Sequence, residues 1–94
     1  MESYYGWTNY ETWRVNLELV DGLSIFDIVP DFSLETRVDE AATYLREFIT
    51  DMVGDEVVNT NSFIQTAVGG FLSRVDWVQI AEHMVYDGRH ELED

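Results

Sequence analysis

The helical spacing of apolar residues between residues 38 and 52 constrains the fold most strongly. At 100° per residue, seven apolar side chains lie within roughly 120° of one another. They are Val38, Ala41, Ala42, Leu45, Phe48, Ile49 and Met52. This spacing predicts an amphipathic helix, because a half-buried strand would alternate with period two. We expect this helix to be the longest in the chain, to begin near Ser33, to cover about residues 34–53 and to end at Gly54.

A first helix is predicted over residues 8–20. Thr8 and Glu11 have the spacing of a capping box, in which each side chain satisfies a free backbone N–H. The stripe of this helix would consist of Tyr10, Trp13, Leu17 and Val20. Asp21-Gly22 supplies the stop, because glycine takes the left-handed conformation that a helix end often needs.

Residues 24–29 fit either a short helix or a buried strand. The helix is favoured because Ser24 and Asp27 lie three residues apart and Pro30 ends the run. The polar connector of the chain is residues 55–61, in which Val57-Val58 is expected to be a short extended piece.

A fourth helix is predicted to start at Thr60 or Asn61. Its apolar residues are Phe63, Ile64, Ala67, Val68, Phe71 and Leu72. Gly69-Gly70 lies inside it at a cost of about 1 kcal/mol per glycine. We therefore expect either a break at this point or another backbone packed very close to it.

The last helix is predicted to open at Asp76, with Gln79 as its capping partner three residues on. Its apolar face would be Trp77, Ile80, Ala81, Met84 and Val85. Gly88 should end the helix, and residues 89–94 should form a frayed acidic tail.

These elements predict one all-α domain over residues 1–94, a compact bundle of four to five short helices. No apolar run reaches the roughly 18 residues of a membrane span. The first residues, Met1 to Tyr5, carry no basic region followed by an apolar one, so a secretory signal is not expected. The expected location is the cytoplasm.

The charge balance narrows the function. The chain has 19 acidic and five basic residues, all five arginine, for a formal net charge of −14. Direct binding of nucleic acid or of an anionic membrane is disfavoured, because both depend on Lys and Arg neutralising phosphates. The absence of cysteine excludes disulfides, Cys-ligated metals and thiol catalysis.

Patterns that carry catalysis are also missing from the sequence. His83 and His90 lack the spacing of a helical zinc pair, and no EF-hand pattern occurs. Gly69-Gly70 is not part of a phosphate-binding loop, which would need a lysine that the chain lacks. We therefore expect no enzyme activity, no cofactor and no metal.

Two segments carry a resemblance. Gly6-Trp7-Thr8-Asn9-Tyr10-Glu11-Thr12-Trp13 resembles the N-terminal G-W-x-N-Y-E-T-W pattern of small phage and mobile-element proteins. Residues 75–83, with the sequence VDWVQIAEH, resemble the V-[ND]-W-x-x-I-A-E-H helix near the end of the same proteins. The resemblance implies a helical fold and a viral or mobile-element setting, and hence the cytoplasm of a host cell. It supplies no catalytic residues.

The acidic residues of the long helix are the candidate binding site. Asp39, Glu40, Glu47 and Asp51 span about 120° on the side opposite the apolar stripe, over roughly 18 Å. The full candidate set is Asp39, Glu40, Glu47, Asp51, Asp55 and Glu56. Fourteen charges match roughly 24 Å of duplex DNA, and a compact chain of this length would be about 30 Å across. The charge per unit length would then resemble that of the double helix.

Two functions are compatible with this pattern. The first is a DNA mimic that blocks the DNA-binding groove of a host nuclease complex, a CRISPR effector before a restriction enzyme. The second is a small phage structural or adaptor protein with apolar contacts, anchored by aromatics such as Tyr4 or Tyr5, whose acidity is only solvation or adaptation to high salt. We expect the protein to be a monomer or a small homo-oligomer.

Overall fold

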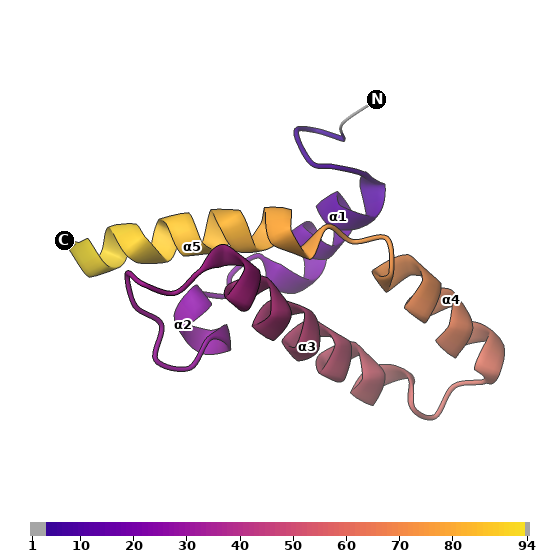
Figure 1. The fold of residues 1–94 in the computed structure, drawn as a ribbon. Helices are drawn as coiled ribbons and strands as arrows, with labels where there is room; N and C mark the ends of the chain where they lie inside the picture. The colour runs from indigo at the N-terminus through magenta and orange to yellow at the C-terminus, as the bar shows by residue number, and fades with distance from the viewer. Residues whose placement is uncertain (1–3, 94) are drawn as a thin grey trace.

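The computed structural model describes residues 4–93, which fold into α-helices joined by short loops (Figure 1). The helices are α1 (Tyr10–Val15) with its π-helical continuation η1 (Asn16–Val20), α2 (Ile25–Ile28), α3 (Val38–Val57), α4 (Ser62–Leu72) and α5 (Trp77–Glu93). No strand occurs within the described range. The predicted all-α bundle is therefore confirmed.

The core lies between α3 and α5, the two longest helices, with α2 packed against both. Each long helix buries one stripe of its surface. The stripes consist of Ala41, Ala42, Leu45 and Ile49 from α3 and Ile80, Ala81, Met84 and Val85 from α5. The apolar faces predicted for these helices are thus largely the ones that are buried. In α3, however, Phe48 and Met52 each keep 36% of their surface exposed.

The starts of α1 and α5 are joined by a network of hydrogen bonds. Asn9 caps α1 by accepting from the Thr12 N–H at 2.9 Å. The Thr12 hydroxyl donates to Asn9 Oδ1 at 2.6 Å and accepts from the Asp76 N–H at 2.8 Å. Thr8 donates through its hydroxyl to Asp76 Oδ2 and through its N–H to Gln79 Oε1. The two segments that carry the family resemblance therefore meet in space, and their polar residues hold helices together.

The capping box predicted for Thr8 and Glu11 is wrong. The cap of α1 is Asn9, one residue later, and the Thr8 hydroxyl instead donates to Asp76 at the start of α5. The apolar stripe predicted for the helix over residues 8–20 is also wrong, because Leu17 is 49% exposed while Thr12 and Val15 are buried. Thr12 and Val15 already face the core within α1, and the π-helical turn that follows, with its i→i+5 hydrogen bond, brings Val20, five residues after Val15, into the same core.

Residues 21–28 follow the prediction. The first helix ends at Val20, and Gly22 takes a positive φ of 93° in the turn that follows. The helical reading of residues 24–29 is confirmed by α2. Both halves of its capping box are present, with the Ser24 N–H donating to Asp27 Oδ2 at 2.9 Å.

The long helix begins and ends later than predicted. Residues 33–36 form a turn in which the Ser33 N–H donates to the Thr36 hydroxyl and the Thr36 N–H donates to the Ser33 carbonyl, so α3 starts only at Val38. Gly54 does not end the helix, which continues to Val57. Val57 is accordingly helical, and the predicted extended piece at Val57-Val58 is wrong.

The connector between α3 and α4 is closed by one side chain. Gln65 Nε2 lies 3.1–3.4 Å from the carbonyl oxygens of Val57, Val58 and Thr60 and shares its two N–H donors among them, while the Val57 carbonyl also accepts from the Thr60 N–H and hydroxyl. Asn61 then caps α4 by accepting from the Ile64 N–H.

Gly69-Gly70 does neither of the two things expected of it. The helix α4 runs through both residues without a break. No neighbouring backbone packs close to them: a Cβ at Gly69 would meet nothing within 4 Å, and one at Gly70 would meet only Arg74 Nη1 at 3.9 Å.

The close approach occurs at Gly88 instead. Asp76 caps α5, as predicted, by accepting from the Gln79 N–H at 3.1 Å, but the reciprocal half of the predicted pair is absent, because the Asp76 N–H donates to Thr12 and the Gln79 side chain binds Thr8 and Gly6. Gly88 does not end this helix; it is buried, and α5 continues to Glu93. The frayed tail predicted from residue 89 is therefore wrong for residues 89–93, and residue 94 lies outside the described range. A Cβ on Gly88 would collide with Ile25 Cγ2 and would lie 2.8 Å from Phe32 Cε2.

Alanine substitutions at Gly69 and Gly88 should have opposite effects on stability. Gly69→Ala should raise the free energy of unfolding by up to about 1 kcal/mol, because alanine favours the helix and the site is open. Gly88→Ala should lower it by about 1–2 kcal/mol, because overpacking against two buried side chains outweighs the same helix gain. Urea denaturation followed by circular dichroism measures both. Equal shifts for the two variants would contradict the packing described at Gly88.

Thr12→Val should lower the free energy of unfolding by about 1–3 kcal/mol, because it leaves the Asp76 N–H without its acceptor. The matched control is Thr50→Val, an exposed position on α3. Thermal denaturation compares the two variants. If Thr12→Val and Thr50→Val melt at the same temperature, the hydrogen bond from the Asp76 N–H to Thr12 contributes little to stability.

Candidate partner-binding surface

All six acidic residues predicted to bind a partner lie on α3 and are exposed. At 100° per residue, the first four span about 120° and Asp55 lies about 40° beyond Asp51. Glu56 points elsewhere, within about 20° of the direction of Leu45. It is exposed because the end of α3 extends past the core. The acidic ridge therefore consists of Asp39, Glu40, Glu47, Asp51 and Asp55, and Glu56 does not belong to it.

The ridge is partly neutralised at its N-terminal end. The Arg37 guanidinium donates to both oxygens of Asp39, at 3.0 and 2.9 Å. This hydrogen bonding holds the pKa of the Asp39 carboxyl below its ordinary value. Among the described residues, the other ion pair joins Arg14 and Glu18 on the first helix. The other four carboxylates of the ridge, Glu40, Glu47, Asp51 and Asp55, have no ion-pair partner in the described chain.

The charge density along the molecule is lower than the sequence suggested. The principal extents are 47 × 32 × 20 Å and the radius of gyration is 14.1 Å, whereas a compact chain of this length has a radius near 12 Å. Fourteen net charges along 47 Å correspond to one per roughly 3.4 Å, half the density of duplex DNA and equal to that of one strand. Averaged over the molecule, the net charge therefore does not reach the expected density of the double helix.

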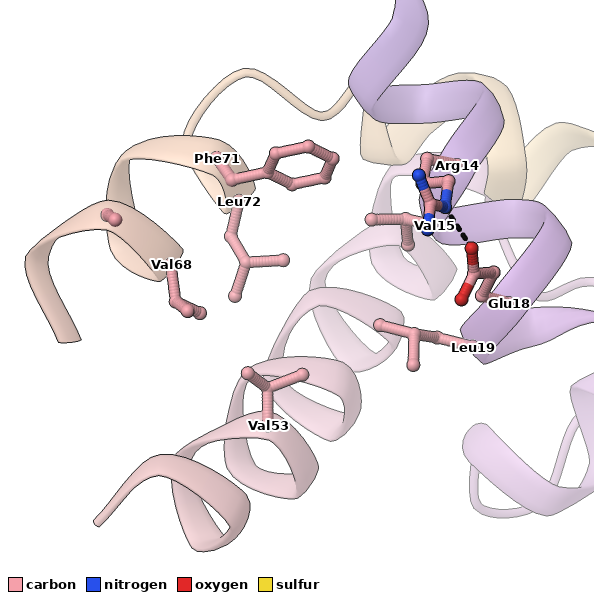
Figure 2. Close-up of a pocket in the computed structure, with 9 residues that line it drawn as sticks. Arg14, Val15, Glu18, Leu19, Val53, Val68, Phe71 and Leu72 are labelled. Atoms are coloured by element: carbon pink, nitrogen blue, oxygen red, sulfur yellow. Dashed lines mark hydrogen bonds and ion pairs between the residues drawn. The ribbon is translucent and has the colours of Figure 1, made fainter. Parts of the chain in front are cut away.

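An apolar groove lies on another side of α3 (Figure 2). Val68, Phe71 and Leu72 of α4 form one wall, and the side chains of Val53, Val15 and Leu19 face them from α3 and the first helix. The Arg14–Glu18 pair lies at the rim. The groove has a volume of about 420 Å³. It was not predicted, although the absence of charge from residues 57–73 is a signal in the sequence that could have found it.

The aromatic anchors of the alternative function lie near α1. Tyr4 packs edge-on against Tyr5, Tyr10 and Trp13, with ring centroids 4.8–5.3 Å apart. Tyr5 is 77% exposed and has a positive φ of 52°. Tyr4 is therefore held within an aromatic cluster, whereas Tyr5 offers its ring to solvent.

The two histidines each lie against an aromatic ring. His83 lies 4.7 Å from Trp7 and His90 4.5 Å from Tyr86, measured between ring centroids. Within residues 4–93, no three His, Asp or Glu side chains are grouped closely enough to hold a metal ion. None of the helices described has both the length and the apolar character needed to cross a membrane.

Comparison with known proteins gives a family but no function. The chain belongs to DUF7249, a family of unknown function, which matches residues 1–87. No curated protein and no solved structure matches the chain.

Arg37→Gln should return the pKa of Asp39 toward its ordinary value. Because the pKa is lowered in the folded protein, the ion pair stabilises the fold at pH values above the ordinary carboxyl pKa, and this contribution disappears as the pH falls through the lowered pKa. Carboxyl chemical shifts followed by NMR during an acid titration measure the change. Arg46→Gln, at an exposed position on the same helix, is the control and should leave Asp39 unaffected. If Asp39 titrates identically in wild type and Arg37→Gln, the pair does not persist in solution.

Proposed function

We propose that this DUF7249 protein is a DNA mimic from a phage or mobile element that blocks a host defence nuclease complex. In this proposal it acts in the host cytoplasm without catalysis and binds no nucleic acid itself. It occupies the DNA-binding groove of the partner, with a CRISPR effector as the first candidate and a restriction enzyme as the second.

The acidic ridge is the observation that carries this proposal. Glu40, Glu47 and Asp51 lie along one exposed face of a 20-residue helix, over about 16 Å. A helix fixes the positions of its carboxylates, and the cations of a DNA-binding groove are already arranged for phosphates, so little reorganisation is needed on either side. Opposite charge also speeds the encounter of the two proteins at low salt.

The ridge itself carries five carboxylates over about 24 Å of helix axis, or about one per 5 Å, which is sparser than duplex DNA or one of its strands. This spacing supports a fit to the cations along one side of a partner groove. Asp39 contributes least to this fit, because Arg37 already occupies both of its oxygens.

The exposed apolar surface of α4 favours the second candidate function, an adaptor. Phe63 is 79% and Val58 64% exposed, so this end of the molecule offers contacts that need no charge. Salt separates the two functions. A DNA mimic should lose affinity for its partner steeply between about 0.1 and 0.5 M salt, because the Debye length becomes shorter than the distances over which the opposite charges attract. Apolar binding should persist over the same range.

Reversing three charges of the ridge should abolish inhibition. The variant Glu40→Lys/Glu47→Lys/Asp51→Lys should no longer protect DNA from cleavage by the host complex, because it presents cations to a cationic groove. Capture from host lysate at low salt, followed by mass spectrometry, identifies the complex, and DNA cleavage by that complex then measures inhibition.

The matched control reverses three exposed acids of α5, as Glu82→Lys/Asp87→Lys/Glu91→Lys. Its net charge changes equally, so it should retain most of the inhibition if the position of the charges matters. Circular dichroism should show the same helix content in both variants. Normal inhibition by the α3 triple variant would exclude the ridge as the binding site.

A further inference from the structure

The helix α4 is exposed in a way that the other long helices are not. None of its 11 residues is fully buried, whereas α3 and α5 each bury four or more. Phe63 is 79% exposed and Ile64 40%, and Val58 in the preceding connector is 64% exposed. Figure 1 shows α4 at the end of the molecule far from the C-terminus, beside the last turns of α3. An apolar helix in this position leaves a surface that water solvates poorly.

This part of the chain is also free of charge. The 17 residues from Val57 to Ser73 include no acidic or basic residue, although charged residues make up 26% of the chain. Solubility alone would favour charged side chains on such an exposed helix. Their absence indicates a surface that is suited to being covered.

We propose that α4 and the apolar groove form the interface of a two-fold dimer, in which the occupant of the groove is α4 of a second copy. Ile64, which is 40% exposed, points within about 20° of the groove-lining Phe71 and 40° of the groove-lining Val68, and Phe63 projects from the adjoining face of α4. A two-fold interface uses the same patch of both copies, so Ile64 of each copy would meet the groove of the other.

The distribution of charge also favours a contact between the α4 regions of two copies. Two copies with a net charge of −14 repel each other over most of their surfaces. The uncharged α4 region is where a second copy can approach without placing carboxylates opposite carboxylates, and the Arg14–Glu18 pair makes the rim of the groove neutral. The four unpaired carboxylates of the acidic ridge point about 120–160° away from Val53 on α3, and Asp39 lies 14 residues before Val53 at the other end of the helix, so the ridge stays outside the interface.

The dimer is independent of the proposed function, and its salt dependence has the opposite sign. Salt screens the repulsion between the copies and strengthens apolar contact, so the dimer should tighten as salt rises. A ridge bound to a cationic groove weakens under the same conditions. Failure of one proposal is thus distinguishable from failure of the other.

Analytical ultracentrifugation of the full chain, with salt increasing from about 0.05 to 0.5 M, tests the interface. Wild type should sediment as a dimer, with a dissociation constant that falls as salt rises. Phe63→Ser and Ile64→Glu should each weaken the dimer at least tenfold while the circular dichroism spectrum stays unchanged, because both side chains are exposed in the single chain.

The control is Tyr86→Ser, which removes another well-exposed aromatic ring (65%, against 79% for Phe63) from α5. It should sediment like wild type. A wild-type monomer at all salt concentrations would overturn the proposal, and so would assembly beyond two copies or a dimer that is indifferent to both α4 substitutions. A dimer that Tyr86→Ser disrupts equally would place the interface elsewhere.

Discussion

The structure depends on the contact between the beginnings of α1 and α5. A buried hydroxyl, that of Thr12, accepts from the first free N–H of α5 and donates to the cap of α1, so each helix completes the start of the other. A buried donor without a partner is costly, and this constraint fixes the register between the two ends of the chain. With α5 positioned in this way, its apolar stripe meets that of α3, and the opposite side of α3 is left to solvent. The acidic ridge is exposed for this reason.

The sequence predicts the existence and type of the helices well, because periodicity and capping are local. The short helix α2 is the clearest case: Ser24 and Asp27 interact within one turn, and nothing distant is needed to place them. The ends of α1 and α5 are different. Thr8 could cap α1, but Asp76 and Gln79 bind it from about 70 residues away. Gly88 resembles a stop signal, yet it is glycine because Ile25 and Phe32 occupy the space of a side chain.

The candidate binding surface likewise has features that local sequence patterns predict and features that they do not. The angular positions of Glu40, Glu47 and Asp51 follow from helix geometry alone. The pairing of Asp39 follows from where the helix starts, because Arg37 occupies the cap position and its side chain reaches forward over the first turn. The direction of Glu56 depends on the continuation of α3 past Gly54 to Val57, whereas the sequence predicts that the helix ends at Gly54. The uncharged stretch over residues 57–73 marks α4 as an apolar surface, but the groove itself forms only because α4 folds back beside α3, which no local pattern encodes.

The acidic ridge and the apolar groove have opposite effects on contact between copies of this protein. A net charge of −14 disfavours contact between copies, whereas an uncharged apolar helix favours it. Both effects can coexist because the two surfaces lie on different sides of α3. An interface through α4 would combine two ridges in one particle and double its charge without placing those charges against each other. A partner groove would then meet one ridge at a time or span both, depending on the angle that the two-fold axis sets between the copies. Assembly through α4 and binding through α3 would in either case be separate properties of the chain, each open to change by substitutions that leave the other intact.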